Sequence, residues 1–321
     1  MHILHSNQQF TVYTVYSPTP SQLLPSCEQN MSCASYSVTV LGQPLHGKTQ
    51  EEISCLLLVD RPEFGQIFGA DHRERLAADT GLVTAVVTEG DLLVSHACIF
   101  YDAACPDVGL LAHVFTHPDH RRRGLSTLVC QALLQSWNMS HSPGSVVVLG
   151  TGSPHAAKVY QREGFTHLLG GLDEGMKGYN VDDMGEWIMV RDTLTMKSYV
   201  DKDKYPFHTR FFTDDPKISN FSLEPLTPSQ LPGLVLLFTS IDERSKMVSI
   251  GIDTGLEAEE ALLKLMMEER LGKGRKSSVV VHHPTKHIHG LAVQDSAVLT
   301  YYAATTGAAE LIETLKQDRK P

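Results

Sequence analysis

The chain has 321 residues, 42% of them hydrophobic, and is therefore long enough to form two ordinary domains with sizeable cores. Its formal charge of −10 argues against a surface built to neutralise nucleic-acid phosphates and fits a cationic substrate such as an amine. No window approaches the roughly 18 uninterrupted apolar residues of a membrane span, and the start lacks the features of a signal peptide. We therefore expect a cytoplasmic protein with no nucleic-acid or membrane partner.

Cysteine and histidine are both present, but their spacing does not favour a metal centre. The six cysteines are scattered without paired spacing, which is typical of reduced thiols. His113, His117 and His120 spread over a strand end and a turn and lack converging geometry. Four further histidines flank a Pro-Thr-Lys turn and are expected to titrate as a surface hairpin: His282, His283, His287 and His289. We therefore expect no metal ion.

The chain begins with a loop-rich leader over residues 1–35 and then becomes regular. Within the leader, residues 10–16 alternate in the manner of a half-buried strand. A short strand is expected at residues 37–41, followed by helical stretches near residues 50–59 and 71–78.

Strands alternate with turns up to a basic loop. Residues 84–88 and 92–100 predict an antiparallel hairpin, because Gly90-Asp91 supplies the turn chemistry between them. Residues 109–116 predict a further strand, which runs into the loop at residues 121–126, Arg-Arg-Arg-Gly-Leu-Ser.

An amphipathic helix follows the basic loop, since apolar residues recur on one helical face: Leu125, Leu128, Val129, Ala132 and Leu133. Residues 146–149 predict a buried strand. The next helix has clear boundaries, because Ser153-Pro154 suits its first turn and Gly164 suits a left-handed residue at its end. A strand around residues 187–190 completes a domain that spans residues 36–195.

The second half starts afresh after a charged, proline-containing linker at residues 196–220. Residues 221–321 predict a second, smaller α/β domain, with a strand at its start, two more at residues 277–281 and 288–293, and helices at residues 257–271 and 308–316. Thr-Pro-Ser-Gln-Leu occurs at residues 19–23 and again at residues 227–231, and the two readings of this echo are coincidence and a duplicated fold.

The strand, the basic loop and the amphipathic helix together form an anion site. Successive backbone N–H groups and the positive end of the helix dipole converge there. Gly124 lets the backbone approach a phosphate closely, and Arg121, Arg122 and Arg123 supply permanent positive charge. With a strand before it and a helix after it, this run fits a pyrophosphate better than it fits a solvated turn.

At this point the sequence resembles the GNAT superfamily of acyl-CoA-dependent N-acyltransferases. Residues 121–125 match the family's acetyl-CoA loop, Gln/Arg-x-x-Gly-x-Gly/Ala, and Ser126 departs from it with another small residue. A second segment, Asn-x-x-Ala-x-x-x-Tyr-x-x-x-Gly-Phe in the family, is matched with serine in place of asparagine by Ser153, Ala156, Tyr160, Gly164 and Phe165. Two motifs in the expected order are more specific than either alone, and the resemblance covers residues 36–195.

The resemblance implies an α+β fold with a mixed, splayed central sheet flanked by helices. It implies acetyl-CoA, or another short acyl-CoA, as the donor, held by Val114, Phe115, Thr116, Arg121, Arg122, Arg123, Gly124, Leu125, Ser126, Ser153 and Ala156. An amine would attack the thioester directly while Tyr160 protonates the departing thiolate. The alternative for Tyr160 is a helix residue that only packs against the sheet.

The resemblance leaves the general base open. Family members often carry Glu or His at positions that here are Leu110 and Ala112, and neither side chain accepts a proton. His113 is adjacent but points the other way unless a bulge shifts the register. The other candidates are His96 and Asp107, acting through a water molecule, and a substrate of modest pKa needs no base.

Three functions remain open from the sequence. They are acyl transfer to a small-molecule amine, acetylation of a lysine side chain in a partner protein, and non-catalytic acyl-CoA binding or sensing. The C-terminal half lacks an Arg-x-x-Gly-x-Gly sequence of its own. It is interpreted as a degenerate GNAT-like half that shapes the acceptor pocket or a homodimer surface.

Overall fold

The computed structural model describes residues 36–42, 51–53, 55, 81–169, 187–193, 206–241, 249–250, 252, 258–295 and 298–317. The strand expected at residues 10–16, the helix expected at residues 71–78 and most of that at residues 50–59 lie outside the described residues. The described residues divide into two compact units. One lies within residues 1–99 and 112–140, and the other lies within residues 100–111 and 141–321.

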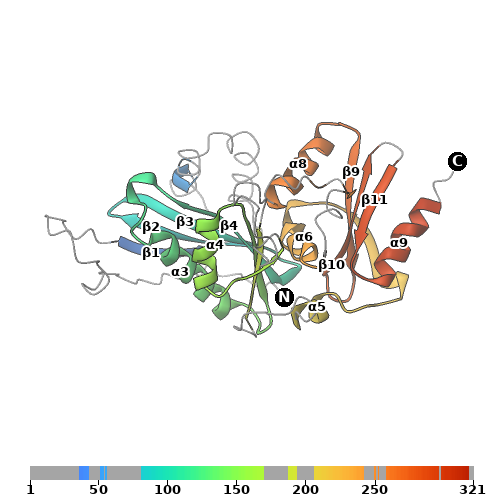
Figure 1. Ribbon diagram of the computed structural model, residues 1–321, viewed down its shortest axis with the longest axis horizontal. Coiled ribbons are helices and arrows are strands. Elements are labelled where there is room, and N and C mark those ends of the chain that lie inside the picture. Colours follow the sequence, from blue (N-terminus) through green and yellow to red (C-terminus); the bar gives the residue numbers. More distant parts are fainter. Residues whose placement is uncertain are drawn as a thin grey trace, which may run out of the picture. The chain divides into compact units, whose positions relative to one another are not determined.

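Seven strands form a mixed sheet in the order β1-β2-β3-β4-β5-β7-β6. Figure 1 labels β1, β2, β3 and β4 of this sheet. β1 pairs antiparallel with β2, β7 pairs antiparallel with β5 and β6, and β4 pairs parallel with β5. The bounds are β1 Tyr36–Gly42, β2 Gly81–Glu89, β3 Leu92–Asp102, β4 Cys105–Thr116, β5 Val146–Thr151, β6 Thr166–Leu169 and β7 Trp187–Asp192. The hairpin predicted around Gly90 is confirmed, and β6 was not predicted.

The sheet is splayed between its two parallel strands. Val108–Leu110 pair with Val146–Val148, while β4 continues to Thr116 and β5 to Thr151. Within β4, His113 has φ 53°, a left-handed value that is uncommon for residues other than glycine. Residues 108–112 are all buried, as in a strand that is covered on both faces.

Two helices follow the central strands. α3, Leu125–Ser140, contacts β1 and β2 through a buried face made of Leu125, Val129, Cys130, Leu133, Leu134 and Trp137. α4, Pro154–Arg162, contacts β5. The predicted boundaries of α4 are confirmed, because Ser153 Oγ accepts from Ala156 N–H at 3.3 Å and Gly164 has φ 90°.

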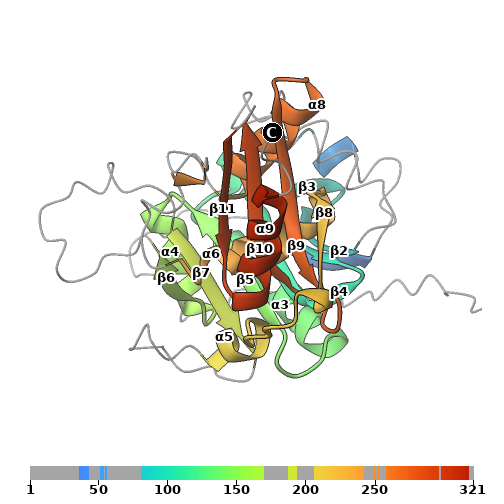
Figure 2. The same cartoon turned by 90° about the vertical axis from the view of Figure 1, so that its right-hand side faces the viewer.

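A second sheet has four antiparallel strands in the order β11-β10-β9-β8. Figure 2 shows α9 lying across one face of this sheet, and Figure 1 places α6 and α8 on the other. The bounds are β8 Phe221–Pro225, β9 Arg275–His282, β10 Ile288–Asp295, β11 Val298–Ala303, α5 Pro206–Phe211, α6 Leu231–Phe238, α8 Ala258–Arg270 and α9 Thr306–Gln317. Short 3-10 turns occur at Pro118–His120, Ile218–Asn220 and Pro228–Gln230.

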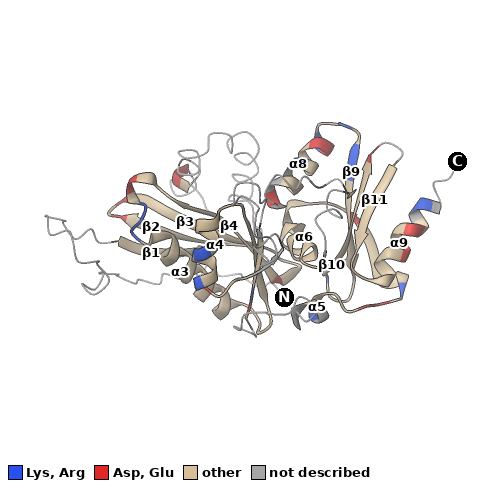
Figure 3. Cartoon of the chain, viewed as in Figure 1, with Lys and Arg blue, Asp and Glu red and all other residues tan. Residues whose placement is uncertain are grey.

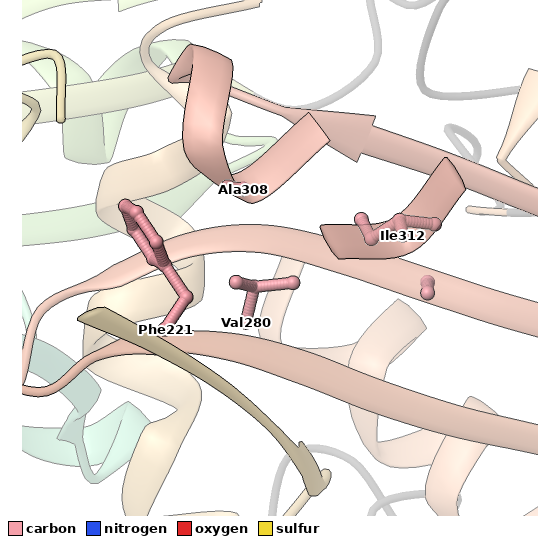
Figure 4. Close-up of a cluster of buried hydrophobic side chains, with 5 residues drawn as sticks. Phe221, Val280, Ala308 and Ile312 are labelled. Carbon is pink, nitrogen blue, oxygen red and sulfur yellow. The ribbon is translucent and has the colours of Figure 1, made fainter. Parts of the chain in front are cut away.

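Beneath α9 lies a small apolar core that joins the helix to the second sheet (Figure 4). Its buried members are Phe221, Val280, Ala292, Ala308 and Ile312. Burying side chains of this kind contributes about 1.5–3 kcal/mol for each large one, so this core fixes α9 on β8, β9 and β10.

The four strands of the second sheet run in the same order as the first four strands of the larger sheet. In both, sequential strands are neighbours, and a helix follows the fourth strand: α3 after β4, and α9 after β11.

Charged residues are spread over the described elements. Acidic and basic side chains are interspersed along α8 and α9 (Figure 3). None of the helices in the described part of the chain has the length and apolar character needed to cross a membrane.

Candidate functional site

The loop between β4 and α3 has a backbone shaped by two left-handed residues. Arg122 has φ 61° and Gly124 has φ 76°. The start of the loop is fixed, because His117 N–H donates to Val94 O at 2.8 Å and a 3-10 turn follows at Pro118–His120. The predicted loop is therefore built as a turn that delivers the chain directly into α3.

Backbone donors gather where this loop meets α3. The N–H groups of residues 122–127 make no hydrogen bond to any other described residue, whereas Leu128 N–H already donates to Gly124 O at 3.0 Å. The first turn of α3 carries no acidic side chain. Unpaired N–H groups and the positive end of the helix dipole favour an anion at this point.

The three arginines of the loop have different surroundings. Arg121 Nε donates to Thr116 O at 3.1 Å, and its guanidinium lies 5.6 Å from the centre of the Phe115 ring. Arg123 donates to the hydroxyl oxygen of Tyr36 at 2.5 Å and to Asp119 O at 3.2 Å. Arg122 makes no such contact with the described residues. Tyr36 was not predicted as part of this site, because 87 residues separate it from Arg123.

Two histidines beside the loop, His117 and His120, make contacts that hold it in place. His120 is 9% exposed, its Nδ1 lies 3.6 Å from a carboxylate oxygen of Glu89, and its ring meets the Tyr36 ring edge to face. His117 Nδ1 accepts from Asp119 N–H at 3.3 Å. These contacts give both residues a structural role in holding the loop.

Tyr160, the predicted general acid, lies on α4 with 8% of its surface exposed. Its ring packs edge to face on Phe165, with the ring centres 6.0 Å apart. Its carbonyl oxygen accepts from the N–H groups of Glu163 and Phe165, which closes the helix just before Gly164. The second motif therefore fixes both the length of α4 and the position of Tyr160.

The predicted proton acceptors differ in exposure. His96 on β3 is fully buried, and neither of its ring nitrogens has a hydrogen-bond partner among the described residues. Burial lowers the pKa of His96 to about 3, which keeps the imidazole neutral and makes it a weak base. His113 is partly exposed. Asp107 is held at 2.9 Å from His287 Nε2.

The interpretation of the second histidine group as a surface hairpin is wrong for three of its four members. His282, His287 and His289 are 8%, 9% and 1% exposed, and only His283 is exposed. The buried rings pack on one another and on Phe211, Phe212 and Phe221. The turn they flank does lie at the surface, but the strands that carry them run into the protein, which a local sequence pattern does not reveal.

The start of α9 corresponds in the second sheet to the start of α3 in the first. There Asp214 occupies the helix end: its Oδ1 accepts from Thr306 N–H at 2.7 Å and its Oδ2 from Thr306 Oγ1 at 3.1 Å. A Cβ at Gly307 would lie 2.3 Å from Asp215 O, so the approach is closed by the chain itself. A carboxylate of the protein thus takes the place that an anion would take at α3.

Comparison with known protein families finds one match. Residues 49–180 match the model of the acetyltransferase (GNAT) domain. This range contains the basic loop, α3 and α4. No curated protein sequence matches the chain.

Solved structures similar to this chain include several acetyltransferases. A GNAT-family acetyltransferase from Staphylococcus aureus is 14% identical, with 49% of this chain and 99% of that one covered and a TM-score of 0.35. Escherichia coli ElaA is 18% identical, with 49% and 99% covered and a TM-score of 0.37. An aminoglycoside 6'-N-acetyltransferase complexed with coenzyme A is 15% identical, with 50% and 99% covered and a TM-score of 0.38.

Proposed function

Because this chain contains a GNAT acetyltransferase domain at residues 49–180, we propose that it transfers an acetyl or other short acyl group from coenzyme A to a primary amine. The single observation that carries the proposal is the loop at residues 121–126. Its free N–H groups, its arginines and the start of α3 form an anion site inside the matched domain.

The pyrophosphate of coenzyme A is proposed to bind the N–H groups of residues 122–126, with Arg121, Arg122 and Arg123 adding positive charge. The pantetheine arm then runs along β4 and uses the backbone of residues 114–116. Ser153 and Ala156, at the start of α4, would complete the contacts. The proposed transfer step uses no metal ion.

The chemistry is a direct transfer. The neutral amine nitrogen attacks the thioester carbonyl carbon, the C–N bond forms, the C–S bond breaks, and Tyr160 gives its phenol proton to the departing sulphur. The nitrogen is positively charged after the attack and loses one proton to a base, and the Tyr160 phenolate regains its proton from solvent. Of the two candidate histidines, His113 is the better proton acceptor, because burial makes His96 too weak a base to take a proton from the amine nitrogen.

Replacement of Tyr160 by phenylalanine tests this role. The change keeps the ring that packs on Phe165 and removes only the proton donor. We expect kcat to fall by roughly a hundredfold, with the dissociation constant of coenzyme A and the thermal midpoint nearly unchanged. Tyr301→Phe is the matched control, because that phenol lies on β11, outside the matched domain, and donates to Glu313 on α9. Normal turnover by the Tyr160 variant would show that its role is packing.

A non-catalytic acyl-CoA-binding module is the second candidate. It is favoured by the apolar side chains at Leu110 and Ala112 and by the burial of His96. A free-thiol assay with acetyl-CoA, a panel of small amines and lysine-containing peptides separates the three functions. Thiol release with small amines supports the first proposal, release only with peptides supports lysine acetylation, and binding without release supports the sensing module.

We propose that the domain extends over residues 36–195 and that the C-terminal region is a partial repeat of it, supported by the shared strand order. We propose a reducing compartment such as the cytoplasm, supported by the four cysteines of the described part of the chain, 55, 98, 105 and 130, which form no disulfide there.

A further inference from the structure

Three side chains with different donor atoms converge at the start of β4. They are Cys105, Asp107 and His287, and their ligand atoms all lie within 4.8 Å of one another. Cys105 Sγ lies 3.1 Å from Asp107 Oδ1, and His287 Nε2 lies 2.9 Å from Asp107 Oδ2. All three residues belong to the same compact unit.

Two of the spacings between these atoms, 3.1 Å and 2.9 Å, are close to those in the ligand shell of a small ion. Bonds from zinc to sulphur, nitrogen and oxygen are about 2.0–2.3 Å long, so ligand atoms around a four-coordinate zinc ion lie roughly 3–4 Å apart. A thiolate with an imidazole selects a transition metal over Mg²⁺ or Ca²⁺. One thiolate and one carboxylate also cancel the charge of a divalent ion, which reduces the cost of burial.

A cavity of about 190 Å³ adjoins the cluster. Cys105 and His287 line it, together with Asp102, Glu224, Gln230 and Lys286 among others. Its volume is several times the roughly 30 Å³ share of one water molecule in the liquid. The cavity therefore has room for a fourth ligand, either water or a small molecule, beside the three protein donors.

The alternative is a hydrogen-bonded chain from thiol to carboxylate to imidazole with no ion. One feature is left unexplained by such a chain. The second ring nitrogen of His287 is buried and has no hydrogen-bond partner among the described residues.

We propose that Cys105, Asp107 and His287 bind a divalent transition-metal ion, with Zn²⁺ as the best fit, and that the fourth position opens into the cavity. On binding, the metal–sulphur bond forms and the thiol proton leaves to solvent. The ion joins β4 to the chain before β10, 180 residues away, and so stabilises the folded state. The site is independent of the proposed acyl transfer.

Cobalt titration of the full chain tests the proposal. Protein freed of metal by a chelator is titrated with Co²⁺, and thiolate-to-cobalt absorption reports coordination by cysteine. We expect one ion per chain, with the absorption lost in Cys105→Ser and affinity at least about tenfold weaker in His287→Gln. Cys98→Ser is the matched control, because Cys98 is also buried but contacts Thr84 instead, at 3.4 Å.

A second measurement uses the unmodified chain and does not depend on the folding of a variant. Zn²⁺ is added before alkylation, and each cysteine is followed by mass spectrometry. We expect Zn²⁺ to slow alkylation of Cys105 at least about tenfold and to leave Cys98 unaffected. Absence of stoichiometric binding, or binding with no cysteine absorption and no protection of Cys105, would overturn the proposal.

Discussion

The guanidinium of Arg123 donates to the hydroxyl oxygen of Tyr36 at 2.5 Å, which ties the basic loop to the first strand of the sheet. Arg122, one residue earlier, makes no such contact with the described residues and sits at a left-handed φ of 61°. The two neighbouring arginines therefore have different roles. Arg123 holds the loop in place, and Arg122 is available to a ligand.

Arg122→Gln should weaken coenzyme A binding more than Arg123→Gln does. A charge-assisted hydrogen bond to phosphate contributes about 1.5–3 kcal/mol, so we expect at least a tenfold loss for Arg122, measured by calorimetry. The Arg122 variant should also show a shallower dependence of affinity on salt concentration. An equal loss in both variants would contradict the division of roles. Tyr36→Phe then shows how much the anchoring of Arg123 matters.

Gly124→Asp should abolish most coenzyme A binding. A side chain there blocks the close approach of the backbone, and a carboxylate repels the phosphates. Gly90→Asp is the matched control, because Gly90 also has a positive φ, of 59°, and both positions are open around an added Cβ. Both variants carry a similar backbone strain of about 1–2 kcal/mol. A folded Gly124 variant that binds as tightly as the control would remove the loop from the site.

Arg210→Met should destabilise the second compact unit. Arg210 donates to Asp192 Oδ1 at 3.0 Å and to Gly144 O at 3.0 Å, and the Asp192 side chain is fully buried. Removing a charged partner of a buried carboxylate costs up to about 3 kcal/mol, which urea unfolding measures. Arg275→Met is the comparison, because its ion pairs are more exposed and should cost less than about 1 kcal/mol. Equal losses would contradict the assignment.

Acid should destabilise the protein partly through His289. Burial, together with the charges of His282 and His287, lowers the pKa of His289 to about 4. The unfolded state then binds the proton first, so stability from this group is complete above pH 6.5 and is lost as the pH falls toward 4. The contribution is at most roughly 3 kcal/mol. His289→Gln should flatten the fall in unfolding free energy between pH 6.5 and 4, and an unchanged slope would contradict it.

The sequence was sufficient to predict those elements whose boundaries depend on one or two neighbouring residues. The turn at Gly90, the cap at Ser153 and the left-handed residue at Gly164 each depend on one or two residues, and all three were predicted correctly. The basic loop was found in the same way. Its geometry follows from the residues that compose it and from the helix that begins at Leu125.

Elements that depend on distant contacts were missed. α6 is apolar on nearly all sides and contains Pro232 and Gly233, so it shows no helical period. It is a helix because it is buried and contacts both β5 and β10. The pairing of Asp107 with His287 could not be predicted from the local sequence either, because the two residues are 180 positions apart.

Asp214 at the start of α9 affects how many coenzyme A molecules one chain is expected to bind. With its own carboxylate bonded to Thr306, the second helix end is already neutralised and is closed by Asp215 beside Gly307. An anion there would have to displace the Asp214 carboxylate. Because this carboxylate is part of the same chain, its effective concentration is far above that of any free nucleotide. The stoichiometry expected from the two halves is therefore one coenzyme A per chain rather than two.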